Sequence, residues 1–62
     1  MNDNERAAME SAMTNWIESA KWRSEAAEAT NRGHAGADVY LQRAEAAAAR
    51  ARADEIAARL AS

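Results

Sequence analysis

The stretch Arg32-Gly33-His34-Ala35-Gly36 is the one interruption in a chain whose composition otherwise favours helix. It holds both glycines of the 62-residue sequence, which has no proline and 19 alanines. Alanine is the strongest helix former, whereas a glycine just after a helix readily adopts the left-handed conformation that ends it. The sequence therefore predicts a helix over about residues 3–31, a turn at residues 32–36 with Gly33 as the helix stop, and a second helix over about residues 37–61.

The start of the first helix has its own local signal. Asn2 followed three residues later by Glu5 approximates a capping box, in which each side chain accepts a hydrogen bond from the backbone of the other residue. Asp3 and Glu5 also place negative charge where the helix dipole favours it. We therefore expect the first helix to begin next to Asn2.

Apolar and small residues repeat alternately four and three apart in both predicted helices. In the first helix this N-terminal stripe consists of Met9, Met13, Trp16, Ala20, Arg23, Ala27 and Thr30. In the second helix the C-terminal stripe consists of Val39, Gln42, Ala46, Ala49, Ala53, Ile56 and Leu60. If the chain folds back at His34 and Ala35, each residue of the N-terminal stripe lies opposite one residue of the C-terminal stripe, from Met9 with Leu60 to Thr30 with Val39. Heptad spacing is typical of a coiled-coil seam, so residues 1–62 are predicted to form one all-α, antiparallel two-helix hairpin whose seam joins the stripes.

The polar members of the stripes, Arg23, Thr30 and Gln42, lie towards the turn. In a coiled coil such residues fix register and orientation. The alternative is that this half of the seam opens towards a partner. Because a chain of this size with few large apolar side chains is marginal alone, we expect a second copy to complete the core as a homodimeric four-helix bundle.

One flank of the predicted hairpin stands out as a binding surface. A helical wheel places Trp22 about 130° from the expected seam, among small residues that let another helix approach. Trp and Arg are the residue types that dominate interface energetics. The predicted partner-binding residues are Ser19, Trp22, Ala26, Leu41, Glu45, Ala48 and Arg52. The alternative is that Trp22 folds over Ala26 and remains partly exposed.

Several classes of protein are disfavoured by composition. There is no cysteine, and His34 is the one histidine, so we expect no metal, no cofactor and no enzymatic activity. No apolar run is long enough to cross a bilayer, and the polar, acidic N-terminus is unlike a secretory signal peptide. We expect a cytoplasmic protein. The abundance of arginine over lysine beside so much alanine indicates GC-rich coding, as in some bacteria and their phages.

These features lead to two functional hypotheses. The first is a small protein-binding module, such as a regulator, an inhibitor or an assembly component, that acts through a helical face. The alternative is a nucleic-acid-binding hairpin dimer that uses Arg32, Arg43 and Arg50. The formal net charge of −2 argues against the second hypothesis, because nucleic-acid binders present a dense basic surface.

Overall fold

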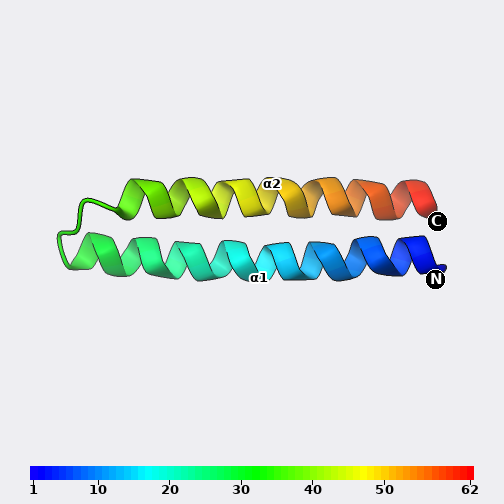
Figure 1. The fold of residues 1–62 in the computed structure, drawn as a ribbon, viewed down its shortest axis with the longest axis horizontal. Coiled ribbons are helices and arrows are strands. Elements are labelled where there is room, and N and C mark those ends of the chain that lie inside the picture. The colour runs from blue at the N-terminus through cyan, green and yellow to red at the C-terminus, as the bar shows by residue number, and fades with distance from the viewer.

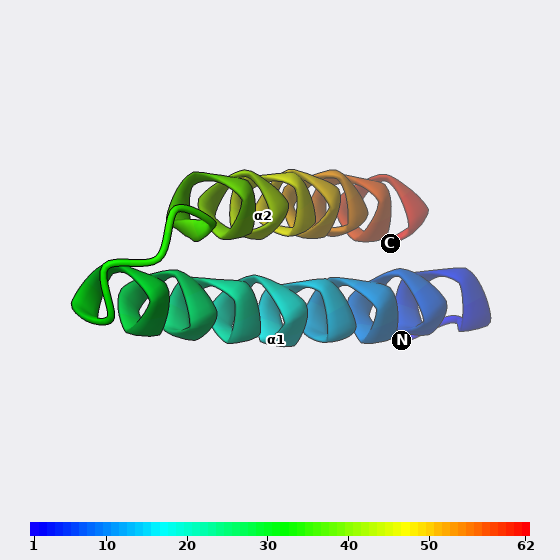
Figure 2. The same ribbon diagram turned by 60° about the vertical axis from the view of Figure 1, so that its left-hand side comes forward.

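The computed structural model describes residues 1–62, which form two helices, α1 (Asp3–Asn31) and α2 (Ala37–Ala61). Figure 1 shows the helices side by side and antiparallel, with the turn at one end and both termini at the other. Turned by 60°, they are seen as two separate rods in a single layer (Figure 2). The Cα atoms extend over 46 × 12 × 9 Å. The predicted all-α two-helix hairpin is therefore confirmed.

Asn2 both caps α1 and joins the two ends of the chain. Its side chain accepts a hydrogen bond from the Glu5 backbone N–H at 2.7 Å, while the Glu5 carboxylate accepts one from the Asn2 backbone N–H at 3.4 Å. The predicted capping box is thus present. In addition, Asn2 Nδ2 donates to the backbone carbonyl of Ala61 at 2.6 Å. The start of α1 is therefore connected directly to the end of α2.

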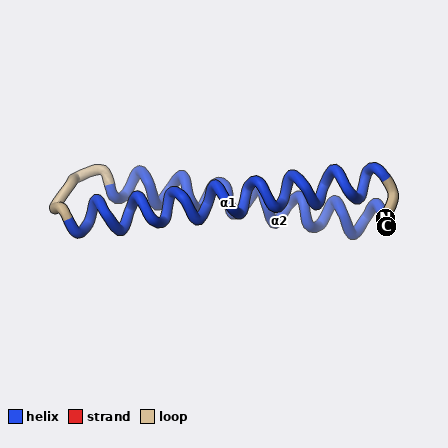
Figure 3. Tube along the Cα trace, turned by 90° about the horizontal axis from the view of Figure 1, so that it is seen from below, coloured by secondary structure: helices blue, strands red, loops and turns tan.

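The turn is built around Gly33, which has the positive φ of 71° that the sequence predicts for a helix stop. Its N–H donates to the Thr30 carbonyl at 3.1 Å, and the His34 N–H donates to the Ala29 carbonyl at 2.7 Å. This pair of hydrogen bonds is the Schellman motif, which satisfies carbonyls at a helix C-terminus. Figure 3 shows that the turn and the chain ends are the only parts outside the helices. Neither helix combines the length and the apolar character that a membrane span requires.

Small side chains make the contact between α1 and α2. The buried residues of α1 are Ala12, Ser19, Ala26 and Ala29, and those of α2 are Ala44, Ala47, Ala48, Ala51 and Ala58. No large side chain is buried. Helix axes in proteins lie about 8–10 Å apart, depending on the side chains between them. An alanine contact therefore favours close packing of the two backbones.

The predicted register of the seam is wrong, because every residue of both stripes is exposed. Ile56 is 52% exposed and Leu60 83% exposed. In α1, the residues that contact α2 come one position before the residues of the N-terminal stripe, as Ser19 comes before Ala20. In α2, the residues that contact α1 come two positions before the residues of the C-terminal stripe, as Ala44 comes before Ala46. One residue turns a helix by about 100° and two by about 200°. The N-terminal stripe consequently lies beside the contact, and the C-terminal stripe lies on the side of α2 that faces away from α1.

Polar side chains explain why the helices adopt this rotation. Ser19 Oγ donates to the backbone carbonyl of Ala44 at 2.9 Å. The Asp54 carboxylate accepts hydrogen bonds from Ser11 Oγ at 2.7 Å and from Asn15 Nδ2 at 2.9 Å. No buried side-chain nitrogen or oxygen lacks a partner. Turning either helix by one residue would break these hydrogen bonds, and a buried polar group left without a partner costs about 1–3 kcal/mol.

The hydrogen bonds to Asp54 lead to a first prediction. Asp54→Ala should lower the free energy of unfolding by about 1 kcal/mol, because Ser11 and Asn15 lose a shared acceptor at a half-buried site. Urea denaturation followed by circular dichroism at one protein concentration measures this change. Glu10→Ala removes an exposed carboxylate on the same hairpin and is the matched control. Equal midpoints for the two variants would show that the Asp54 hydrogen bonds do not stabilise the hairpin.

Candidate protein-binding surface

Trp22, the expected centre of the binding flank, is part of the hairpin's own packing. It is half-buried and stacks on Tyr40 of α2, with ring centroids 5.6 Å apart and an interplanar angle of 22°. Two cations lie over the same ring, Arg43 Cζ at 4.8 Å and Lys21 Nζ at 5.2 Å from its centroid. Stacking and cation–π contacts of this kind contribute to folding when both partners belong to one chain. Little of the Trp22 ring is left for a second molecule.

The other residues predicted for this surface divide into two groups. Ser19, Ala26 and Ala48 are buried, with no more than 3% of their surface exposed. Leu41, Glu45 and Arg52 are exposed on α2. The structure therefore does not bring the predicted residues together on one open surface. The cause is the rotation of α1, which turns the small-residue face that carries Ser19 and Ala26 towards α2.

The arginines of the nucleic-acid hypothesis are mostly engaged within the hairpin. Arg50 contacts the Glu18 carboxylate at 3.3 Å and donates to Asn15 Oδ1 at 3.2 Å. Arg32 lies 4.0 Å from the Glu28 carboxylate, and Arg43 lies over Trp22. Neighbouring carboxylates reduce the positive potential that a phosphate backbone would meet. These contacts favour a solvated, mixed-charge face.

An apolar groove replaces the Trp22 flank as the candidate site. This α1 groove has a volume of about 410 Å³ and is lined by Met9, Ala12, Met13, Trp16, Ile17, Ala20 and Glu55. Its large side chains, all from α1, are between 38% and 65% exposed. Four of the seven lining residues belong to the N-terminal stripe. The heptad pattern thus identified most of the groove, but assigned its residues to the interior of the hairpin.

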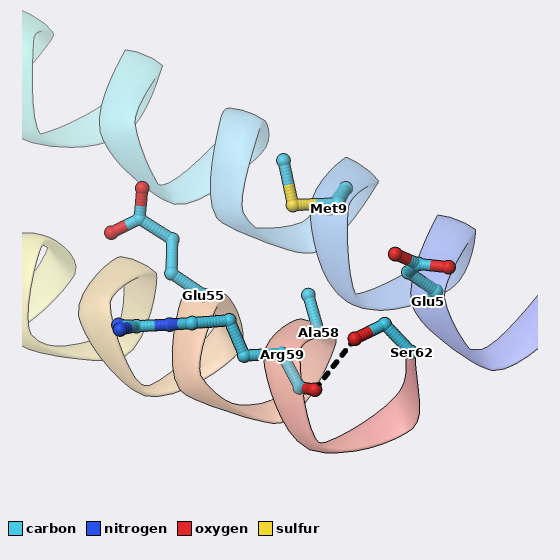
Figure 4. A pocket seen from close by; sticks show the side chains of 6 residues that line it. All are labelled: Glu5, Met9, Glu55, Ala58, Arg59 and Ser62. Atoms are coloured by element: carbon cyan, nitrogen blue, oxygen red, sulfur yellow. Dashed lines mark hydrogen bonds between the residues drawn. The ribbon is translucent and has the colours of Figure 1, made fainter. Parts of the chain in front are cut away.

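A polar hollow of about 370 Å³ adjoins the α1 groove near the chain ends. Figure 4 shows Glu5 and Met9 of α1 across from Ala58 of α2 and from Ser62, which follows the end of α2, with Glu55 and Arg59 alongside. Ser62 Oγ donates to the backbone carbonyl of Arg59 at 2.8 Å. Met9 and Glu55 line both spaces. The hollow therefore provides charged groups of both signs at one edge of the apolar groove.

The outer face of α2 is a second exposed apolar surface. It is the C-terminal stripe, which contains no charged residue and has Gln42 as its single polar member. Val39, Ile56 and Leu60 are each at least 49% exposed. Alanines at 46, 49 and 53 form the middle of this face and are also exposed. The hairpin thus presents apolar surface in two different directions.

No group of three or more His, Cys, Asp or Glu side chains is placed to hold a metal ion. The distinctive surfaces of the hairpin are instead the α1 groove and the outer face of α2. Comparison of the chain with protein-family models, with curated proteins and with solved structures finds no match.

Proposed function

We propose that the chain is a small, non-enzymatic protein-binding module that acts through the exposed apolar faces of its helices. The observation that carries this proposal is the α1 groove, where Met9, Met13, Trp16 and Ile17 are exposed around one hollow. Apolar patches on small proteins usually mark interaction sites. Trp is also one of the residue types enriched at interface hot spots, and interfaces typically have a polar rim around an apolar centre. A regulator, an inhibitor or an assembly component would each use such a surface.

The hairpin's area and core favour self-association. Its accessible surface is 4428 Å², whereas a compact monomer of its mass exposes about 3,900 Å². Its buried core consists of alanines and Ser19, so the large apolar side chains that remain exposed contribute little to folding until a partner covers them. A second copy is the partner always present at synthesis. The smallest such assembly places two hairpins together as four helices.

Sedimentation equilibrium and thermal melting over a wide range of protein concentration test this proposal. We expect the mass to exceed that of one chain and the thermal midpoint to rise with concentration, since association stabilises only the folded state. Trp16→Glu should weaken association by at least about tenfold, because it places a charge in the groove.

Thr14→Glu is the matched control, since it adds the same charge two residues away at an exposed position outside the groove. It should associate as the wild type does. A wild-type mass of one chain at millimolar concentration, with a midpoint independent of concentration, would reject self-association through the groove.

A further inference from the structure

The N-terminal and C-terminal stripes have the same spacing along the sequence, but they face different directions in the structure. Both follow the same alternation of four and three residues, so they can pair rung by rung in antiparallel orientation. Within one hairpin they cannot meet, because one lies beside the helix contact and the other on the outer face of α2. All their residues are exposed. The two stripes can therefore pair with each other only when they belong to two different molecules.

We propose that the N-terminal stripe of one hairpin packs antiparallel against the C-terminal stripe of a second copy, so that the chain assembles head to tail. This inference rests on the proposed function and specifies its partner and its geometry. A contact between two different surfaces of the same chain is heterologous. However many copies are joined, the first has one free stripe and the last has a free stripe of the other kind. Further copies can therefore add at both ends until a ring closes or a filament forms.

Side-chain sizes are compatible with this pairing. In the rung-by-rung register Met9 lies opposite Leu60 of the next copy, and Met13 lies opposite Ile56. Trp16 lies opposite Ala53, and Ala53 together with the neighbouring Ala49 leaves room for its ring. Large side chains thus meet near the chain ends, and Trp16, the largest side chain of the stripes, meets an alanine. The alternation of large and small residues allows the two helices to interdigitate.

Charge favours the same register. Arg23 and Glu45 belong to neither ion pair of the hairpin. Arg23 is exposed in the N-terminal stripe, and the proposed pairing places it opposite Ala46 of the next copy, one residue from Glu45. Both charges therefore gain a partner on assembly. A single exposed pair of this kind contributes modestly, but it distinguishes one register from another.

A two-fold contact between groove faces is the competing geometry, and α2 argues against it. On the groove side, α2 carries the charged residues Glu55 and Arg59. The C-terminal stripe carries no charge at all. Covering an apolar stripe with another apolar stripe avoids desolvating those charged groups, which is costly unless each one is paired. The outer face of α2 is therefore the better surface for the N-terminal stripe.

Complementation between two blocked variants tests the head-to-tail geometry. Met13→Glu blocks the N-terminal stripe and Ile56→Glu blocks the C-terminal stripe, each at an exposed position of the hairpin. Either variant alone should associate at least about 100-fold more weakly than the wild type, because an unpaired charge would be buried at its contact. Mixed together, they retain one intact N-terminal stripe and one intact C-terminal stripe. Sedimentation velocity should then show a 1:1 pair and nothing larger.

The controls and the opposite outcomes separate this inference from the proposed function. Thr14→Glu and Ala57→Glu, each next to a blocked position, should assemble as the wild type does. If Ile56→Glu associates normally while Met13→Glu does not, the contact is two-fold through α1; the head-to-tail inference is then wrong and protein binding through the groove stands. A wild type that remains a single chain overturns both the head-to-tail inference and self-association through the groove.

A charge exchange gives a second test that does not require blocked variants to fold alone. Arg23→Glu and Glu45→Arg should each weaken wild-type assembly by about two- to fivefold, the range for an exposed ion pair. The double variant restores opposite charges across every contact, so it should recover wild-type association. Failure of the double variant to recover would overturn the proposed register. Helix content from circular dichroism accompanies each measurement, so that loss of folding is recognised.

Discussion

Ala51→Leu should lower the free energy of unfolding by about 3 kcal/mol, the upper part of the range for overpacking a well-packed site. Ala51 is fully buried between the helices, at the middle of α2. A leucine there must push α1 and α2 apart. The surrounding alanine contacts depend on close approach, so a small separation forfeits a large part of their attraction. In a hairpin with so little core, a loss of this size leaves much of the chain unfolded at room temperature. Circular dichroism during denaturation, at one protein concentration, measures the effect.

Ala57→Leu is the matched control for this experiment. Ala57 is an exposed position of the same helix, and leucine is nearly as good a helix former as alanine. We expect its unfolding midpoint to stay close to that of the wild type. If Ala51→Leu were as stable as Ala57→Leu, or more stable, the helices would not be held together by close alanine packing.

Trp22→Ala should lower the free energy of unfolding by about 2 kcal/mol even at concentrations too low for association. The substitution removes the ring that stacks on Tyr40 and that lies beneath Arg43 and Lys21. Truncating a buried aromatic side chain costs about 3–5 kcal/mol, and Trp22 is half-buried, which reduces the expected loss. Denaturation at micromolar concentration isolates this effect from assembly.

Trp16→Ala provides the contrast, since it removes the same residue type from the same helix. Trp16 is 38% exposed and lines the α1 groove, so its truncation should change the dilute unfolding midpoint less than Trp22→Ala does. It should instead weaken association at high concentration. The reverse result, with Trp16→Ala the more destabilising in dilute solution, would support the seam expected from the heptad stripes and contradict the observed rotation of the helices.

The two helices and the turn could be predicted from the sequence, because the signals for them are local. The capping box of Asn2 and Glu5 involves residues three apart, and Gly33 ends α1 through its own backbone conformation. A connection as short as residues 32–36 is typical of two antiparallel helices that pack side by side, so the hairpin could also be expected from the sequence. None of these features depends on which side of α1 faces α2.

The rotation of each helix, and with it the candidate site, could not be predicted from the sequence, because it depends on contacts between the two helices. Several faces of this alanine-rich chain share the heptad spacing, so the pattern alone does not rank them. If the face with the largest apolar side chains is taken as the buried one, the stripe that contains Met13 and Trp16 is predicted to form the seam. The folded chain instead gains close backbone packing at alanines and hydrogen bonds at Ser19 and Asp54, which involve residues far apart in sequence. Those energies appear only when both helices are present. They place Trp22 inside the hairpin and leave the large apolar residues of α1 on its surface.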